Sequence, residues 1–141
     1  GYVRSVAIQQ GLPIDRKSLQ SLGQRLIEEN VNQFCENVLK SNDLLESNYF
    51  ILDGIRHGSV LSYFKSNYPL IFIYVTASYE TLRSRLEVRG EAELIDSLHT
   101  EPTEMEVEGI LKDQADLIVS GEFSIEDQIA KIKLALSSYT T

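Results

Sequence analysis

The stretch YFILDGIRHGSV, residues 49–60, ends an apolar run on one carboxylate, that of Asp53. A carboxylate at the end of a buried strand can orient the hydration shell of Mg²⁺ or accept a proton. Gly54 removes a side chain beside it, so a ligand or a backbone segment can come close. Arg56 adds a planar guanidinium that suits phosphate. These residues are candidates for phosphate chemistry. The alternative is a turn at Asp53-Gly54 and a surface ion pair of Arg56.

A second group of candidates lies in LRSRLEVRG, residues 82–90. Arg85 and Arg89 are four residues apart, so they share one face of a helix. Two guanidinium groups on one face can stabilise a phosphoryl group during its transfer. The alternative is a surface helix whose arginines pair with neighbouring acids, which are Glu80, Glu87 and Glu91.

Cys35 is the only cysteine, so the chain has no intrachain disulfide, which fits a reducing compartment. Its neighbours in sequence include Val31, Phe34 and Val38. We therefore expect Cys35 to be part of the packed core and not a catalytic thiol, which needs a histidine beside it.

The composition is that of one globular domain, residues 1–141, with 43% hydrophobic and 24% charged residues. The net charge of −8 disfavours binding to nucleic acid, which depends on Lys and Arg neutralising phosphates. No apolar run approaches the roughly 18 residues that a membrane helix needs, and no signal peptide is visible. We expect a cytoplasmic protein without a nucleic-acid or membrane partner.

The apolar pattern predicts alternating strands and helices. Asp15 or Ser18 is expected to cap a helix that continues to about Lys40, and Ser78 to cap a helix that stops at Gly90. Thr103 to Glu106 is a capping box, and Ser124 is expected to cap the last helix. Short helical patterns fill the intervals, and the expected strands are 2–8, 49–53, 70–75 and 115–121.

This order indicates an α/β fold, a three-layer α/β/α arrangement with a mostly parallel sheet. Ligands in such sheets bind at the carboxyl ends of the strands. Asp53 ends the strand expected at 49–53, and Arg85 and Arg89 lie on the helix that follows the strand expected at 70–75. The elements therefore bring both groups toward one edge of the sheet.

Four segments carry a family resemblance through their order along the chain: YFILDGIR, LIFIYVTAS, ETLRSRLEVRG and ADLIVSG. The chain resembles the P-loop nucleotide and nucleoside monophosphate kinases, including their dephospho-coenzyme A kinase-like relatives. The resemblance covers roughly residues 1–138. It implies transfer of the ATP γ-phosphoryl group to a nucleotide or a related small phosphate acceptor, with ATP and Mg²⁺ as cofactors.

The resemblance also implies roles for single residues. Asp53 is the strand-end acid, near the acceptor or linked through water to Mg²⁺, and Arg56 contacts the acceptor substrate. Arg85 and Arg89 are the lid arginines that stabilise the transferred phosphate. The loop after ADLIVSG lies near the adenine base, and the acceptor-binding helices begin near residue 15.

Two features depart from the family. The phosphate-binding loop G-x-x-x-x-G-K-[ST] is absent from the sequence, and the segment after Arg89, GEAELID, is acidic where a lid is usually basic. The chain starts at Gly1 and has a single methionine, Met105. We expect a kinase-like domain that lacks its first strand and P-loop, which makes the chain inactive by itself.

Other interpretations stay open. A non-catalytic binding or scaffold domain can have a kinase-like fold, and a homodimer is compatible with the sequence. A flavodoxin-like domain also alternates strands and helices, but it calls for early acids or a phosphate-binding loop after its first strand. The sequence contains neither.

Overall fold

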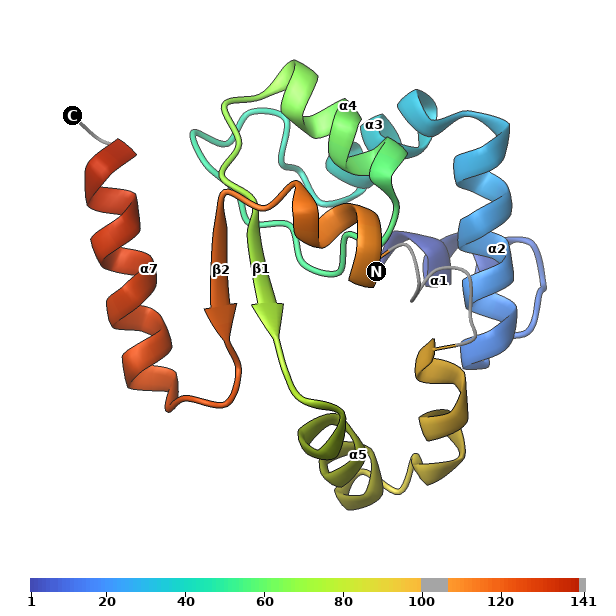
Figure 1. The fold of residues 1–141 in the computed structure, drawn as a ribbon. Helices are drawn as coiled ribbons and strands as arrows, with labels where there is room; N and C mark the ends of the chain where they lie inside the picture. Colours follow the sequence, from blue (N-terminus) through green and yellow to red (C-terminus); the bar gives the residue numbers. More distant parts are fainter. Residues whose placement is uncertain (100–106, 140–141) are drawn as a thin grey trace. The chain divides into compact units, whose positions relative to one another are not determined.

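The computed structural model describes residues 1–99 and 107–139, and the chain divides into two compact units (Figure 1). Unit 1 consists of residues 1–55 and 59–68. Unit 2 consists of residues 56–58 and the chain from Pro69 onward.

Unit 1 is helical. Its first three helices contact one another, and the buried residues Val6, Ala7 and Leu22 form the centre of a core between α1 and α2. The fourth helix buries Val60, Leu61 and Phe64. The helices are α1 (Tyr2–Gln9), α2 (Arg16–Glu29), α3 (Val31–Ser41) and α4 (Gly58–Asn67).

The strand expected at 2–8 is wrong, because this segment is the helix α1. Tyr2, Val3, Val6 and Ala7 recur at intervals of three and four residues, which places them on one helical face. Val6 and Ala7 are buried, and Tyr2 and Val3 pack against the same cluster. The helical period of this short segment therefore determines its structure.

The helix expected to run to Lys40 is two helices. Asp15 caps the first as predicted, since its carboxylate accepts a hydrogen bond from the Ser18 backbone N–H at 3.0 Å. The helical backbone is interrupted at Asn30, whose own backbone is extended. The Asn30 side chain accepts from the Gln33 N–H at 3.0 Å and so begins α3.

The strand expected at 49–53 is also wrong. These residues form no helix or strand, and the side chains of Tyr49 and Ile51 are 89% and 93% exposed. A β-strand is stabilised by its neighbours more than by its own propensity. Among the described residues the sheet contains β1 and β2 alone, so nothing pairs with this apolar run.

Unit 2 contains that sheet. The strands β1 and β2 pair in parallel from Ile73 opposite Leu117 to Thr76 opposite Ser120. The helix α7 contacts β2, and both strand arrows point the same way in Figure 1. The elements are β1 (Ile73–Thr76), α5 (Tyr79–Val88), η1 (Ala92–His99), η2 (Val107–Leu111), β2 (Leu117–Ser120) and α7 (Ile125–Tyr139).

The sequence signals in this unit are largely confirmed. Ser78 caps α5 by accepting from the Thr81 N–H, and Gly90, at φ 72°, ends it. The N–H groups of Gly90 and Glu91 return to the carbonyls of Glu87 and Leu86, which is the Schellman arrangement. The strands at 70–75 and 115–121 form as the shorter β1 and β2. The capping box at 103–106 lies outside the described residues, and the three-layer arrangement stays a prediction.

Candidate functional site

The candidate site lies at one edge of the β1–β2 pair. Because the strands are parallel, their carboxyl ends meet at the same edge, where open α/β sheets bind ligands. The chain leaves this edge through Ser78 into α5 and through residues 121–124 into α7 (Figure 1). We call residues 121–124 the β2–α7 turn.

Gly121 brings the two strand ends into close contact. Its N–H donates to the Thr76 carbonyl at an N···O distance of 2.6 Å. A Cβ atom at position 121 would lie only 2.8 Å from the same carbonyl oxygen, closer than van der Waals contact. The site therefore requires glycine at this position for a steric reason.

Arg85 projects from α5 to the same place. Its Nη2 donates a hydrogen bond to the Gly121 carbonyl oxygen at 2.8 Å. The predicted catalytic residue Arg85 is thus at the expected edge of the sheet, with one donor committed to the backbone. The rest of its side chain is largely exposed.

Glu122 completes the contact between the β2–α7 turn and α5. One carboxylate oxygen accepts from the Ser78 backbone N–H at 2.6 Å, and the other accepts from Thr81 Oγ1 at 2.6 Å. The hydrogen bond from Thr81, then that from Ser78, lower the pKa of Glu122 from its ordinary value of 4.5, and the charge of Arg85 acts in the same direction. The carboxylate also faces the N-terminus of α5, where negative charge is favoured.

Sequence reasoning did not select Glu122. The available signal was the pattern of ADLIVSGE, an apolar run followed by glycine and an acid. That pattern resembles the one that selected Asp53.

Arg89 and Arg83 differ in their surroundings. Arg83 Nε lies 3.0 Å from Glu87 Oε1, which is the surface ion pair that the alternative interpretation expected. Arg89 is the C-cap residue of α5, one helical turn beyond Arg85, and is exposed. Its guanidinium has no hydrogen-bonding side-chain partner within residues 1–99 and 107–139.

Asp53 and Arg56 lie in the irregular segment before α4. Asp53 is exposed and does not end a strand, which removes the premise that selected it. Gly54 beside it has a positive φ of 77°. Arg56 is exposed and belongs to unit 2, whereas Asp53 belongs to unit 1. Within unit 2, the structure brings Arg85 to the sheet edge through its hydrogen bond to the Gly121 carbonyl.

Cys35 is 1% exposed on α3, which confirms its place in the core. Burial raises the pKa of the Cys35 thiol to about 11. Because the thiolate is the reactive form, a thiol with this pKa is a poor nucleophile near neutral pH.

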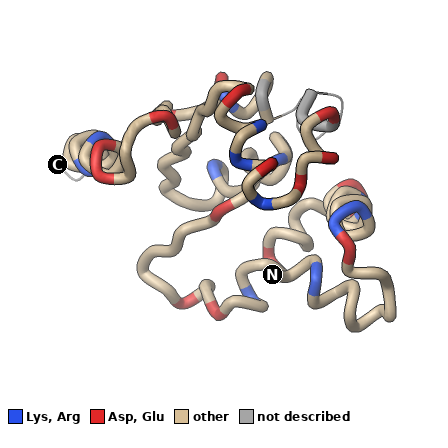
Figure 2. The backbone as a smooth tube through the Cα atoms, turned by 90° about the horizontal axis from the view of Figure 1, so that it is seen from below, with Lys and Arg blue, Asp and Glu red and all other residues tan. Residues whose placement is uncertain are grey.

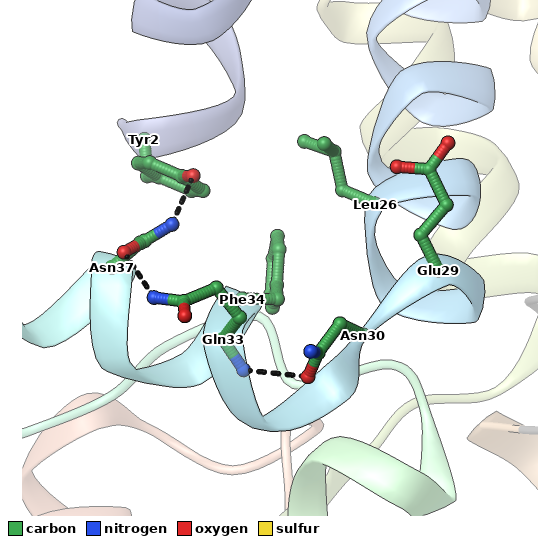
Figure 3. Close-up of a pocket in the computed structure, with 7 residues that line it drawn as sticks. All are labelled: Tyr2, Leu26, Glu29, Asn30, Gln33, Phe34 and Asn37. Atoms are coloured by element: carbon green, nitrogen blue, oxygen red, sulfur yellow. Dashed lines mark hydrogen bonds between the residues drawn. The ribbon is translucent and has the colours of Figure 1, made fainter.

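Unit 1 has a small pocket, shown in Figure 3, with a volume of about 110 Å³. Along one wall, the Gln33 amide donates to Asn37, and the Asn37 amide donates to the Tyr2 hydroxyl at 3.0 Å. Phe34 packs edge-on against the Tyr2 ring, with centroids 5.6 Å apart. Ligand pockets usually measure about 300–1,000 Å³, so this hollow is too small for a whole nucleotide. It is lined by Tyr2, Leu26, Glu29, Asn30, Gln33, Phe34 and Asn37.

Figure 2 shows acidic and basic positions interspersed along the described chain. The net charge of −8 nevertheless belongs mostly to unit 2, which has 14 Asp and Glu against 7 Lys and Arg, whereas unit 1 has 7 against 6. In the part of the chain that the structure describes, no three His, Cys, Asp or Glu side chains gather as metal ligands. None of the described helices is long and apolar enough to cross a membrane.

Comparisons of the chain with protein-family models, curated proteins and solved structures find no match. The functional argument therefore depends on the geometry of the sheet edge and on the residues around it.

Proposed function

We propose that this chain is the acceptor- and lid-bearing part of a kinase that transfers the ATP γ-phosphoryl group to a nucleotide or a related small phosphate acceptor. The observation that carries the proposal is the carboxyl edge of the β1–β2 pair. There, α5 with Arg85 and Arg89 follows one strand, and the β2–α7 turn follows the other. Phosphoryl transfer depends mainly on positioning and on positive charge near the phosphate.

Each predicted site residue has a role in this proposal. Arg89, exposed at the end of α5, contacts the transferred phosphate, and Arg85 supports the same face. Arg56 contacts the acceptor. Asp53 accepts a proton from the acceptor or holds a water molecule of the metal shell. The last two roles rest on the family resemblance and not on their place in the structure.

The chain needs further groups for catalysis. The sequence lacks the G-x-x-x-x-G-K-[ST] loop that cradles the phosphates of ATP, so we expect no transfer by this chain alone. Mg²⁺, when bound with ATP, neutralises charge on the phosphates. One exposed carboxylate, that of Asp53, suits Mg²⁺ only through water, with the nucleotide supplying the other ligands.

The proposed partner is a small nucleotide-type substrate, with no nucleic-acid or membrane partner. A cytoplasmic location agrees with the single unpaired cysteine. A homodimer remains compatible with the proposal.

The proposal is tested by supplying the missing element. The chain is fused behind a strand–P-loop–helix segment, and transfer from γ-labelled ATP is measured with nucleoside monophosphates and dephospho-coenzyme A as acceptors. We expect transfer to at least one acceptor and a loss of about a hundredfold or more in Arg89→Ala, as for the loss of a charge-stabilising donor. Arg83→Ala is the matched control and should keep its activity. No transfer to any acceptor by a folded fusion would contradict the proposal.

A non-catalytic binding or scaffold domain is the second candidate. The contact between Arg85 and the Gly121 carbonyl favours it, because a guanidinium that holds the backbone is serving the fold. This candidate predicts a folded fusion that binds nucleotide without transferring phosphate.

A further inference from the structure

Two separate contacts join the β2–α7 turn to α5. Arg85 donates to the Gly121 carbonyl, and Glu122 accepts from the Ser78 N–H and from Thr81 Oγ1. Positions 78, 81 and 85 are spaced by three and four residues, so they form one face of the helix and its cap. Two consecutive residues of the turn are therefore held along two turns of α5.

The turn is also fixed at its other sides. The Gly121 N–H donates to the Thr76 carbonyl at the end of β1, and Gln128 of α7 donates from its side chain to the Phe123 carbonyl at 2.8 Å. A Cβ at position 121 would lie 2.8 Å from the Thr76 carbonyl oxygen, so the backbone of the turn passes close to the end of β1. Contacts to β1, α5 and α7 thus converge on three residues of the turn.

We propose that Arg85 and Glu122 act as a clamp, which makes the β2–α7 turn and α5 move as one body. Arg85 is then a positioning residue, and Arg89 is the arginine that contacts phosphate. The division of roles between the two arginines rests on the proposed function. The clamp itself rests only on the contacts within unit 2.

The two residues of the clamp support each other. Glu122 holds the first turn of α5, and Arg85 holds the second, so loss of either leaves the β2–α7 turn attached to α5 at one end of this face only. Arg85 is the charged group that acts on the Glu122 carboxylate. The neighbouring pair of Arg83 and Glu87 has a similar distance and exposure but lies entirely on α5, which makes it a matched control.

Amide hydrogen exchange of the 141-residue chain, followed by NMR, tests the clamp. In Arg85→Ala and in Glu122→Ala, we expect exchange at Ser78 and at residues 121–123 to become roughly two- to tenfold faster, the range for losing one or two hydrogen bonds. The effect of the double variant should be less than the product of the two single effects. Arg83→Ala and Glu87→Ala should leave these amides unchanged.

Glu122→Gln gives a second readout in a variant of the same size. The Ser78 amide proton should shift with pH in the wild type, with a midpoint below 4.5, and should lose this titration in Glu122→Gln. A Ser78 amide that ignores pH in the wild type, or turn amides unchanged in Arg85→Ala, would overturn the clamp whatever the activity of the chain. Absence of phosphoryl transfer in the P-loop fusion would instead overturn the proposed function and leave the exchange result standing.

Discussion

Two stretches of this chain look alike in sequence and differ in structure. YFILDGIR at 49–56 and ADLIVSGE at 115–122 are both apolar runs with a glycine and an acid near the end. The second forms β2 and places Glu122 at the sheet edge, whereas the first is irregular and leaves Ile51 93% exposed. The difference is pairing, because β2 has β1 beside it and residues 49–53 have no strand partner among the described residues.

This comparison teaches that an acid after an apolar run is informative only when the run is paired. A paired strand fixes the direction in which the chain leaves the sheet, so the residues after it meet those of the neighbouring strand. Glu122 therefore contacts Ser78 and Thr81, which are more than forty residues away in sequence. The Asp53 side chain remains exposed.

The largest expected effect is at Gly121, and Gly54 in the other unit is the comparison. Gly121→Ala places a Cβ against a backbone carbonyl that cannot move without disturbing the end of the sheet, so we expect a loss of about 3 kcal/mol in the free energy of unfolding. Gly54→Ala meets no atom within 4 Å but must hold φ near 77°, at a cost of about 1 kcal/mol. Urea denaturation of both variants measures the difference. Equal losses would mean that the close approach at Gly121 is not a constraint.

The next largest effect is expected for side-chain truncation in β2, compared with the same change in the irregular segment 49–53. Val119 is 1% exposed in β2, so Val119→Ala should lower the free energy of unfolding by about 2 kcal/mol through lost burial and a small cavity. Ile51→Ala should change it by less than about 0.5 kcal/mol, as for an ordinary surface site. Thermal and urea unfolding provide the values. A large loss for Ile51→Ala would show that residues 49–53 are packed in solution.

A smaller effect concerns the carboxylates that accept backbone hydrogen bonds in each unit. Hydrogen bonds from Ser18 lower the pKa of Asp15, and those from Thr81 and Ser78 lower the pKa of Glu122. A lowered pKa in the folded state means stability that is present above the unfolded value and is lost as the pH falls through the folded value. Both contributions should therefore begin to decline as the pH falls to the ordinary values of 3.8 for Asp15 and 4.5 for Glu122, and they are lost once it falls below the lower pKa values of the folded chain.

NMR of the side-chain carboxyl carbons checks this prediction. Both carboxylates should titrate below their ordinary values in the folded chain. In Thr81→Val, which removes the hydroxyl donor, the pKa of Glu122 should rise toward 4.5 while that of Asp15 stays where it was. A Glu122 that titrates at or above 4.5 in the wild type would show that its hydrogen bonds are not formed in solution.

The predictable part of the fold is the part encoded by local signals. Ser78 and Gly90 bound α5, and Asp15 begins α2, because caps and left-handed glycines act within a few residues. The strands of unit 2 also followed from their apolar runs. The strand expected at 49–53 does not form, since a strand depends on a distant partner that the apolar run itself does not specify.

The candidate site shows the same division. Helical spacing predicted that Arg85 and Arg89 share a face of α5, but it did not show that Arg85 binds the Gly121 carbonyl. The pattern of ADLIVSGE marks Glu122 as an acid after an apolar run, but its partners Ser78 and Thr81 lie more than forty residues away in sequence. Such long-range contacts follow from strand register, and register is not written in either strand alone.

The most direct test of the account is to titrate the fusion of this chain behind a strand–P-loop–helix segment with Mg²⁺–ATP at millimolar concentrations, while following the backbone amides by NMR. Nucleotide is expected to bind at the edge of the β1–β2 pair, so the largest changes in amide chemical shift should be at residues 76–78, at Arg85 to Arg89 and in the β2–α7 turn. Arg89→Ala should weaken them, and Arg83→Ala should not. Shifts gathered at the pocket of Tyr2, Phe34 and Asn37, or no shifts at the sheet edge, would contradict the account.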